Sequence, residues 1–358
     1  MLTLLKQFQK NGFTLKNHIV MAPMTRSRAI YNLPNELMAE YYQQRSGAGL
    51  IISEGTAPSP EALGYPNIPG IFSKAQVEGW KLVTEKVHLT NSKIFLQLMH
   101  TGRIGHTDNL PAGAALAGVS DITAAGQIFT MNGMKDHSQP VALSTTEIKN
   151  VIQSFVTAAE NALEAGFDGV EIHGANGYLL EQFLNPNVNN RTDTYGGTLE
   201  NRSRFIIELS KALVEAIGNN KVGIRFSPFS TLGDLAAYDE EQIHLTYSYL
   251  AQQLNALNLL YLHIGVNTPI PEKTFDSIRE EFEGIIILSN GLTSESAEKA
   301  LQGNFADLVA FGRAFLANPD LVERIEKNAV LNNVDFTTLY SPGAIGYTDY
   351  PMLHQMIF

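Results

Sequence analysis

Two short apolar runs, Ile285-Ile286-Ile287-Leu288 and Leu308-Val309-Ala310-Phe311, enclose a helix-like stretch, Thr293–Leu301. Neither run alternates apolar and polar residues, which is typical of strands that are buried on both faces of a parallel sheet. A helix between two such strands covers one face of the sheet and lets the next strand run in the same direction. The segment therefore predicts a strand–helix–strand unit with parallel strands.

The same unit recurs along the whole chain. We predict eight strands, at Ile19–Ala22, Leu50–Ser53, Ile94–Leu98, Gly169–His173, Val222–Phe226, Leu260–Ile264, Ile285–Leu288 and Leu308–Phe311. We predict helices at Asn35–Arg45, Ala75–Leu89, Thr146–Ala165, Leu199–Ile217, Glu240–Leu257, Thr293–Leu301 and Ala314–Asn328, with Glu272–Phe282 as a doubtful eighth. Eight repeats indicate an α/β fold of the (β/α)8 TIM-barrel type. A doubly wound open sheet is the alternative, but no strand is followed by G-x-G-x-x-G and the chain has no G-x-x-x-x-G-K-[ST] motif.

The chain is longer than the roughly 250 residues typical of such a barrel, since it has 358. A long Gly/Ala-rich stretch between Thr101 and Ser144 accounts for much of the surplus, and we expect a lid-like insertion there (about 101–144) after the third strand. The segment Gln7–Lys16 contains the turn signal Asn11-Gly12 and predicts an N-terminal hairpin that closes the barrel floor. No linker or composition shift is visible, so we expect residues 1–358 to form one domain.

Composition excludes several kinds of function. The chain has 25 Lys+Arg against 36 Asp+Glu and a formal net charge of −11, which disfavours binding to nucleic acid. It has no Cys, which excludes disulfides, thiolate zinc sites, iron–sulfur clusters and cysteine nucleophiles. Lys6 interrupts the apolar N-terminal stretch, and the longest aliphatic run, Ile285–Leu288, is far shorter than a membrane span of about 20 residues. We therefore expect a cytoplasmic protein without membrane contact.

In a TIM barrel, the reacting groups lie at the carboxyl ends of the strands. Here these ends carry few acidic residues, and they lack the paired carboxylates of a glycosidase. Asn290-Gly291 after the seventh strand and Gly312-Arg313 after the eighth fit a phosphate site built from backbone N–H groups and a guanidinium. The alternative for Arg313 is an ion pair with a surface acid.

The end of the fourth strand carries a second group of polar residues. His173 and Asn176 offer two hydrogen-bond donors on one short loop, and the phenol of Tyr178 follows. Two donors aimed at one oxygen would polarise a carbonyl or nitro group. A tyrosine that stays protonated at neutral pH could then deliver a proton. Taken alone, a His and a Tyr at a strand end more often serve the structure, and a reduction would require a cofactor.

The residues at the strand ends resemble the Old Yellow Enzyme family. The resemblance extends from about Asn17 to Pro351 and rests on motifs that occur in one order: Ala22-Pro23-Met24-Thr25-Arg26-Ser27-Arg28, Gln97 with His100-Thr101-Gly102-Arg103, Gly169–Leu180, Gln182-Phe183-Leu184, Arg191-Thr192-Asp193 with Tyr195-Gly196-Gly197, and Ala310-Phe311-Gly312-Arg313. Members of this family bind FMN non-covalently at the barrel mouth and reduce activated alkenes with NADPH or NADH.

The resemblance implies a role for each of these positions. Pro23, Met24 and Thr25 would line the flavin, Ala57 and Gln97 would contact its ring, and Arg225 would lie beside N1 and O2. Asn290, Gly291, Gly312 and Arg313 would form the phosphate site. His173 and Asn176 would hold the oxygen of an electron-poor alkene (an enone, enal, maleimide or nitroalkene), or of a nitro compound, while Tyr178 protonates the α-carbon.

Three further residues are candidates for the walls of the substrate pocket, namely Tyr65, Met99 and Tyr347, although each could equally pack in the core. Met99 departs from the family pattern, because many members with Thr beside the flavin carry Trp at this position. We therefore expect a reshaped pocket mouth.

Two other functions are considered: a flavin-free phosphate-binding barrel lyase and a non-catalytic flavin-binding sensor. The lyase would need a Schiff-base lysine or a metal at a strand end, and neither is visible. His100 and His106 lack an accompanying carboxylate or Cys, so we predict no metal site. A sensor would have no use for a proton donor such as Tyr178. The physiological substrate, the choice of NADPH or NADH, and a monomeric or homodimeric state stay open from the sequence.

Overall fold

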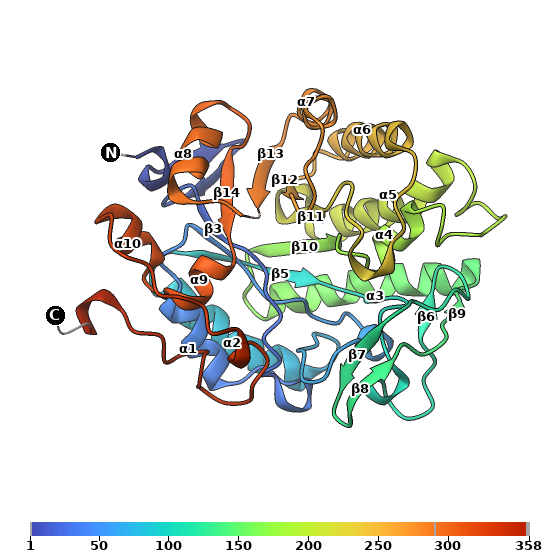
Figure 1. Cartoon of the computed structure of the whole chain (residues 1–358), viewed down its shortest axis with the longest axis horizontal. Coiled ribbons are helices and arrows are strands. Elements are labelled where there is room, and N and C mark those ends of the chain that lie inside the picture. The colour runs from blue at the N-terminus through green and yellow to red at the C-terminus, as the bar shows by residue number, and fades with distance from the viewer. Residues whose placement is uncertain (1, 290, 356–358) are drawn as a thin grey trace.

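A computed structural model, which describes residues 2–289 and 291–355, contains a closed barrel of eight parallel strands (Figure 1). The strands are β3 (Ile19–Met21), β4 (Leu50–Ile52), β5 (Lys93–Leu98), β10 (Gly169–Gly174), β11 (Val222–Phe226), β12 (Tyr261–Gly265), β13 (Ile285–Ser289) and β14 (Leu308–Phe311). Each strand pairs with its neighbour along the chain, and β14 pairs with β3 to close the ring. The predicted barrel and its eight strands are confirmed.

Helices follow the strands and form the outer layer (Figure 1). They are α1 (Glu36–Gln44), α2 (Lys74–His88), α3 (Thr145–Glu164), α4 (Leu179–Leu184), α5 (Leu199–Ile217), α6 (Glu240–Ala256), α7 (Glu272–Glu281), α8 (Ser294–Gln302), α9 (Arg313–Ala317) and α10 (Leu321–Glu326). The doubtful stretch Glu272–Phe282 is thus a helix. The predicted helix Ala314–Asn328 is two helices, because Pro319 lies between α9 and α10 and has no N–H to continue the first. The short α4 was not predicted.

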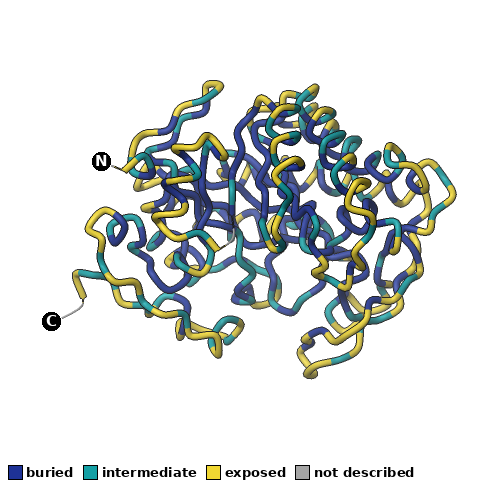
Figure 2. The backbone as a smooth tube through the Cα atoms, turned by 45° about the horizontal axis from the view of Figure 1, so that its top comes forward, coloured by how far each residue is buried: buried dark blue, intermediate teal, exposed yellow. Residues whose placement is uncertain are grey.

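The strands are apolar on both faces because the core has two layers, one inside the barrel and one between the barrel and the helices. In β13, Ile285 and Ile287 belong to the cluster inside the barrel, whereas Ile286 belongs to the cluster between barrel and helices. Leu50 and Ile52 of β4 likewise point inward, and Ile51 points outward. Both faces of each strand are therefore buried, as the buried tube at the centre of Figure 2 shows.

The predicted hairpin at the N-terminus is confirmed. It consists of β1 (Phe8–Lys10) and β2 (Phe13–Leu15), which pair antiparallel. Asn11 and Gly12 have φ angles of 50° and 77°, as a two-residue turn of this type requires. Phe13 belongs to the inner cluster and meets the ring of Phe95 edge to face, so the hairpin packs against the inside of the barrel.

The insertion after β5 contains its own small strands. β7 (Gln127–Thr130) and β8 (Gly133–Asp136) form an antiparallel hairpin, and β6 (Ala117–Gly118) pairs with β9 (Val141–Ala142). In Figure 1 these strands lie together at one side of the barrel, away from both termini. Across the described residues, no helix combines the length and apolar character needed to cross a membrane.

Candidate active site

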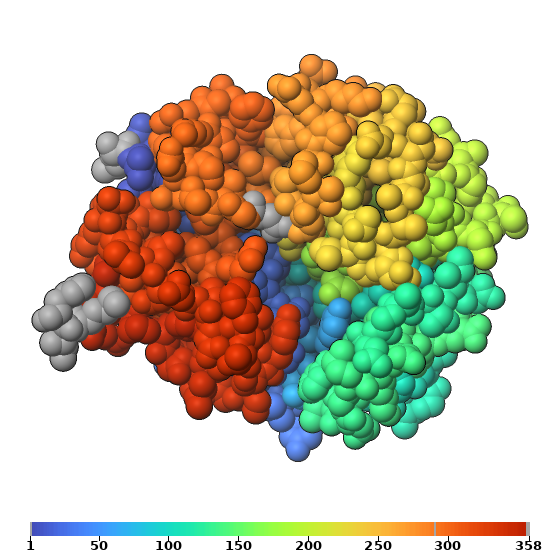
Figure 3. All heavy atoms as spheres, viewed as in Figure 1, coloured from blue at the N-terminus to red at the C-terminus, as the bar shows by residue number. Residues whose placement is uncertain are grey.

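The carboxyl ends of the strands open into a cavity of about 590 Å³, which we call the central cavity. It is lined by Pro23, Thr25, Ser27, Tyr65, Pro66, Gln97, Met99, Phe129, Met134, His173, Asn176, Tyr178, Arg225 and Tyr340. Figure 3 shows a hollow on this side of the molecule, between the C-terminal segment in red and the insertion in green. The structure thus brings the predicted catalytic triplet together with four of the predicted flavin residues, Pro23, Thr25, Gln97 and Arg225, and with two of the predicted pocket residues, Tyr65 and Met99.

His173 lies at the end of β10 and presents one ring nitrogen to the cavity. Its Nδ1 accepts a hydrogen bond from the backbone N–H of Ala175 at 3.3 Å. Burial, and then the nearby charge of Arg225, hold the pKa of His173 well below its ordinary value, so the ring is neutral at neutral pH. A neutral ring that accepts at Nδ1 carries its hydrogen at Nε2, which makes His173 a donor.

Asn176 is held by its backbone and by its side-chain oxygen. Its N–H donates to Ser227 Oγ at 2.8 Å, and its Oδ1 accepts a hydrogen bond from Asn267 Nδ2 at 2.8 Å. The side-chain oxygen is therefore occupied on the protein side. This leaves the amide hydrogens of Asn176 as donors for a ligand in the central cavity.

Tyr178 is the residue before α4, and its ring meets that of His173 edge to face, with 4.9 Å between ring centroids. Its hydroxyl lies 2.9 Å from the hydroxyl of Tyr65. Burial raises the pKa of the Tyr178 phenol well above 10, and the neighbouring Tyr65 raises it further. Tyr178 is thus a protonated acid beside two donors.

The buried carboxyl group of Glu171 holds Gln97, which lines the central cavity. Glu171 Oε1 accepts a hydrogen bond from Gln97 Nε2 at 2.8 Å, and its Oε2 lies 2.8 Å from Nδ1 of His263. The bond to Glu171 uses one amide hydrogen of Gln97, so its carbonyl oxygen and second hydrogen remain for a ligand. Gln97 can therefore pair with a planar ring that offers both a donor and an acceptor.

Arg225 is the buried cation of the site. Among the described residues no group accepts a hydrogen bond from its guanidinium, and its Nε is buried without a partner. A buried guanidinium without acceptors is costly unless a ligand supplies them. Arg225 therefore fits an anionic or carbonyl-bearing ligand in the central cavity.

A second cavity of about 320 Å³ adjoins the central one, because Pro23 and Arg225 line both. Its other walls are Ala22, Met24, Gly291, Leu292, Ala310, Phe311, Gly312, Arg313 and Ala314. Gly291 has a φ of 66°, and a Cβ built there would meet no atom within 4 Å, so its backbone is open to a ligand. These residues fit the predicted phosphate group of a flavin whose ring lies in the central cavity. Asn290, predicted for the same site, falls outside the described residues.

Two predicted contacts are not where we expected them. Tyr347 is fully buried and stacks on Tyr41, with centroids 4.0 Å apart, and it does not line the central cavity. It is a core residue, so the prediction of a pocket wall is corrected. Ala57 lines neither cavity and is buried in the same apolar cluster as Met99.

Several lining residues were missed by sequence reasoning. Phe129 and Met134 come from the β7–β8 hairpin, which shows that the insertion walls the central cavity. Tyr340 comes from the C-terminal segment, which Arg28 holds by donating to the carbonyl oxygens of Thr338 (2.9 Å) and Ile345 (3.1 Å). The sequence feature that could have indicated Tyr340 is its position, as an aromatic residue in a loop close to the Gly346-Tyr347 motif.

The barrel, the two adjoining cavities and the buried Arg225, whose guanidinium has no hydrogen-bond acceptor among the described residues, fit a TIM-barrel oxidoreductase with a flavin site. A sequence profile of the NADH:flavin oxidoreductase / NADH oxidase family matches residues 4–332. The chain belongs to this family, the Old Yellow Enzyme family, and is an NAD(P)H-dependent flavin oxidoreductase.

Individual relatives are similar over nearly the whole chain. 12-Oxophytodienoate reductase 1 of Oryza sativa subsp. japonica is 43% identical over 99% of this chain and 94% of its own length. The structure of morphinone reductase in complex with tetrahydroNAD has a TM-score of 0.94 and 42% identity, covering 98% of this chain and 97% of that one. The Old Yellow Enzyme homologue of Zymomonas mobilis has a TM-score of 0.93 and 39% identity, with coverages of 98% and 100%.

Proposed function

We propose that the protein is an FMN-dependent ene-reductase that uses NADPH or NADH to reduce the C=C bond of electron-poor alkenes. One observation carries the proposal: His173, Asn176 and Tyr178 face the same cavity as Gln97 and Arg225. The first three suit a substrate with a polar oxygen, and the last two suit a flavin ring. A site that only bound flavin would not need the first three.

The flavin site is assigned to residues on both cavities. Pro23, Thr25, Gln97 and Arg225 would hold the ring in the central cavity, and Met24, Gly291, Gly312 and Arg313 would hold the ribityl phosphate in the second. When bound, FMN supplies the redox chemistry, since it takes a hydride from NAD(P)H and passes a hydride to the β-carbon of the alkene. The fixed charge of Arg225 favours negative charge on the ring.

The substrate site is assigned to the donors and the phenol. Nε2–H of His173 and the amide of Asn176 would bind the carbonyl or nitro oxygen, and so stabilise negative charge that develops there. Tyr178 would donate its proton to the α-carbon. Tyr65 and Met99 would form pocket walls together with Phe129, Met134 and Tyr340.

The relatives support reduction of this type. Similar proteins are named 12-oxophytodienoate reductase and morphinone reductase, and one structure of morphinone reductase is a complex with tetrahydroNAD. We propose enones, enals, maleimides and nitroalkenes as the substrate classes of this chain, with nitro compounds as further acceptors.

A visible spectrum of the purified protein tests the proposal. We expect the absorbance of bound oxidised flavin, release of FMN on denaturation, bleaching by NADPH or NADH under nitrogen, and recovery on addition of 2-cyclohexenone. A protein that does not take up FMN would overturn the assignment of the cofactor. A flavoprotein that bleaches with a nicotinamide nucleotide but is not reoxidised by any enone, maleimide or nitroalkene would overturn the assignment of the reaction.

A further inference from the structure

The loop that carries Asn176 and Tyr178 has an unusual backbone. Asn176 and Gly177 have φ angles of 59° and 79°, so two consecutive residues are left-handed. This conformation is unfavourable for a residue with a side chain and persists where neighbouring groups hold it. Because the side chains on both sides of Gly177 line the central cavity, their spacing depends on what holds this loop.

Glu181 holds the two N–H groups of the left-handed pair, one directly and the other through the hydroxyl of Ser227. Its Oε2 accepts a hydrogen bond from the backbone N–H of Gly177 at 2.7 Å. Its Oε1 accepts from Ser227 Oγ at 2.8 Å, and Ser227 Oγ in turn accepts from the N–H of Asn176 at 2.8 Å. One carboxyl group thus holds Gly177 directly and Asn176 through a single hydroxyl.

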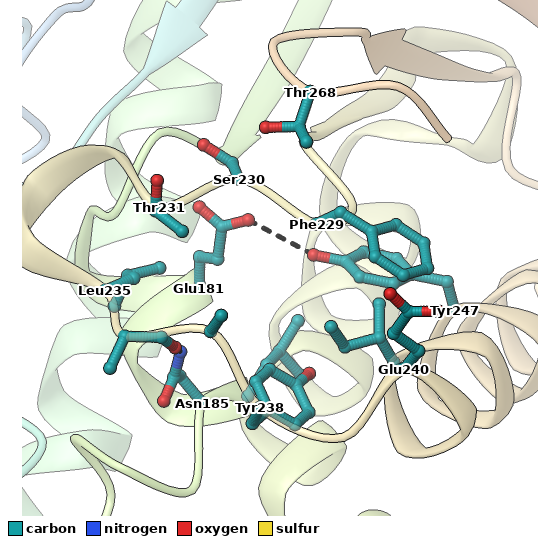
Figure 4. A pocket seen from close by; sticks show the side chains of 14 residues that line it. Glu181, Asn185, Phe229, Ser230, Thr231, Leu235, Tyr238, Glu240, Tyr247 and Thr268 are labelled. Carbon is teal, nitrogen blue, oxygen red and sulfur yellow. Dashed lines mark hydrogen bonds between the residues drawn. The ribbon is translucent and has the colours of Figure 1, made fainter. Parts of the chain in front are cut away.

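The carboxyl group is itself fixed and lies outside the central cavity. Tyr247 of α6 donates to Glu181 Oε1 at 3.2 Å, the contact drawn in Figure 4. Glu181 is buried, and it lines a separate cavity of about 270 Å³, which shares no lining residue with the central one. On the other side of the loop, Gln182 Nε2 donates to the carbonyl oxygen of Gly177 at 2.7 Å. Glu181 therefore acts on the loop from behind, out of contact with substrate.

We propose that Glu181 is a positioning residue for the reduction: its carboxyl group fixes the Asn176-Gly177 backbone and so sets where the Asn176 amide and the Tyr178 phenol meet the substrate. This inference rests on the proposed function, since it assigns to Glu181 the placement of the two groups that bind and protonate the alkene. Without the carboxyl group, the N–H of Gly177 would be buried without an acceptor, and the left-handed pair would relax.

Glutamine is the matched conservative replacement. Burial raises the pKa of Glu181 to about 7, against the opposing effect of the Gly177 amide and the Ser227 hydroxyl, so a neutral carboxyl group is compatible with the site. A glutamine amide can still accept from Gly177 with its oxygen and donate to Ser227, whose oxygen keeps a lone pair for Asn176. Alanine can do neither.

The test compares single-turnover oxidation of FMN-loaded, pre-reduced enzyme by 2-cyclohexenone. We expect Glu181→Ala to lower this rate at least about 10-fold, because misplaced groups lose much of their effect, and Glu181→Gln to stay within about 3-fold of wild type. Glu240→Gln is the control, since Glu240 lines the same outer cavity but is exposed and is not bonded to the loop. Its rate should equal that of wild type.

The same substitution is then made in an Asn176→Ala/Tyr178→Phe background, where the groups that Glu181 positions are absent. In that background, we expect Glu181→Ala to lower the rate of oxidation by less than about 3-fold. An equal loss in both backgrounds would mean that Glu181 acts through overall stability, and would overturn the inference. A wild-type rate for Glu181→Ala would also overturn it.

Failure of the proposed function gives a different result. In that case the Asn176→Ala/Tyr178→Phe enzyme would itself oxidise at the wild-type rate. If Glu181→Ala does not fold or bind FMN, Ser227→Ala takes its place, because it removes only the link to Asn176. In the wild-type background, we expect Ser227→Ala to lower the rate of oxidation at least about 3-fold. In the double-substituted background, we expect it to have no effect. An equal loss of rate in both backgrounds would again overturn the inference.

Discussion

The hydroxyl oxygens of Tyr178 and Tyr65 lie 2.9 Å apart, and either can be the donor. Their rings meet edge to face, with centroids 6.3 Å apart. Burial raises the pKa of both phenols, so both keep their protons at neutral pH. If Tyr178 gives up its proton, as we propose, Tyr65 can donate a hydrogen bond to the phenolate that forms. The pair thus suits one proton delivered in each turnover.

Replacement of Tyr178 by Phe should therefore slow alkene reduction selectively. General-acid catalysis of this type contributes roughly 10²–10⁴-fold, and we expect oxidation of the reduced enzyme by 2-cyclohexenone to fall by at least about 10-fold. Binding of FMN and its reduction by NAD(P)H should be largely retained. Stopped-flow measurement of the two half-reactions separates them. Tyr65→Phe keeps the proton donor and should lose less, so equal losses in the two variants would contradict the assignment.

The barrel could be predicted from the sequence because its strands are buried on both faces. Runs such as Ile285–Leu288 carry apolar residues to the inner and outer clusters alike, and few other folds produce that pattern eight times. The prediction failed where local pattern does not decide structure. The helix after β14 is broken at Pro319, and the short α4 has too few residues to show a helical period.

The site was predicted to the extent that its residues lie at strand ends. His173, Arg225 and Gln97 line the central cavity because a barrel brings the carboxyl ends of its strands to one side. Residues of long loops that line the cavity, such as Phe129 and Tyr340, could not be predicted in this way. An aromatic residue in a loop can pack inward or face the cavity, and its contacts decide which. Tyr347 was assigned to the cavity but stacks on Tyr41 in the core.

Replacement of Arg225 by Met should lower the reduction potential of bound FMN. The guanidinium has no hydrogen-bond acceptor among the described protein groups, so its charge is available to a reduced, anionic ring. A tenfold loss of that stabilisation corresponds to about 30 mV for a two-electron couple. Spectroelectrochemical titration measures the shift, and Arg225→Lys, which keeps the charge, should shift the potential less. An unchanged potential in Arg225→Met would show that the charge does not act on the ring.

Replacement of Met99 by Trp should narrow the central cavity. Met99 is buried and already fills the space beside Gly55, where an added Cβ would come within 2.5 Å of its sulfur. A larger ring must therefore extend into the cavity. We expect kcat/KM for bulky cyclic enones to fall roughly 10–100-fold relative to 2-cyclohexenone, which is the range that a small change in an apolar pocket produces. Met99→Leu conserves volume and should keep the ratio. If Met99→Trp leaves the ratio of the two kcat/KM values unchanged, Met99 does not contact the substrate.

Ionisation of the buried Glu54 should destabilise the folded protein as the pH rises. Burial raises its pKa from 4.5 to about 7, against the opposing effects of Arg26 and Tyr42. The folded protein thus holds this proton more tightly than the unfolded chain, so the stabilisation is complete below about pH 4.5 and is lost as pH rises through 7. The shift corresponds to up to about 3 kcal/mol. Urea denaturation at pH 5 and pH 8 should show a decrease in the free energy of unfolding that is smaller in Glu54→Gln. An identical decrease would assign the pH dependence to other groups.

Replacement of Gly177 by Ala should damage activity more than a comparable change elsewhere. Gly177 has a φ of 79°, and a Cβ there would lie 2.2 Å from the carbonyl oxygen of Leu232. Gly197 has nearly the same φ, 80°, but a Cβ there would meet no atom within 4 Å. Both substitutions cost about 1–2 kcal/mol from the backbone conformation alone. The clash at Gly177 adds to this and must displace the loop between Asn176 and Tyr178.

Circular dichroism and thermal denaturation report the cost that the two alanine variants share, and single-turnover oxidation by 2-cyclohexenone reports the cost that is specific to Gly177. We expect Gly197→Ala to be destabilised but active, and Gly177→Ala to lose at least about 10-fold in rate at a temperature where both are folded, because a displacement of about 1 Å in reacting groups can cost about 100-fold. Equal rates in the two variants would mean that the alkene step does not depend on the position of this loop.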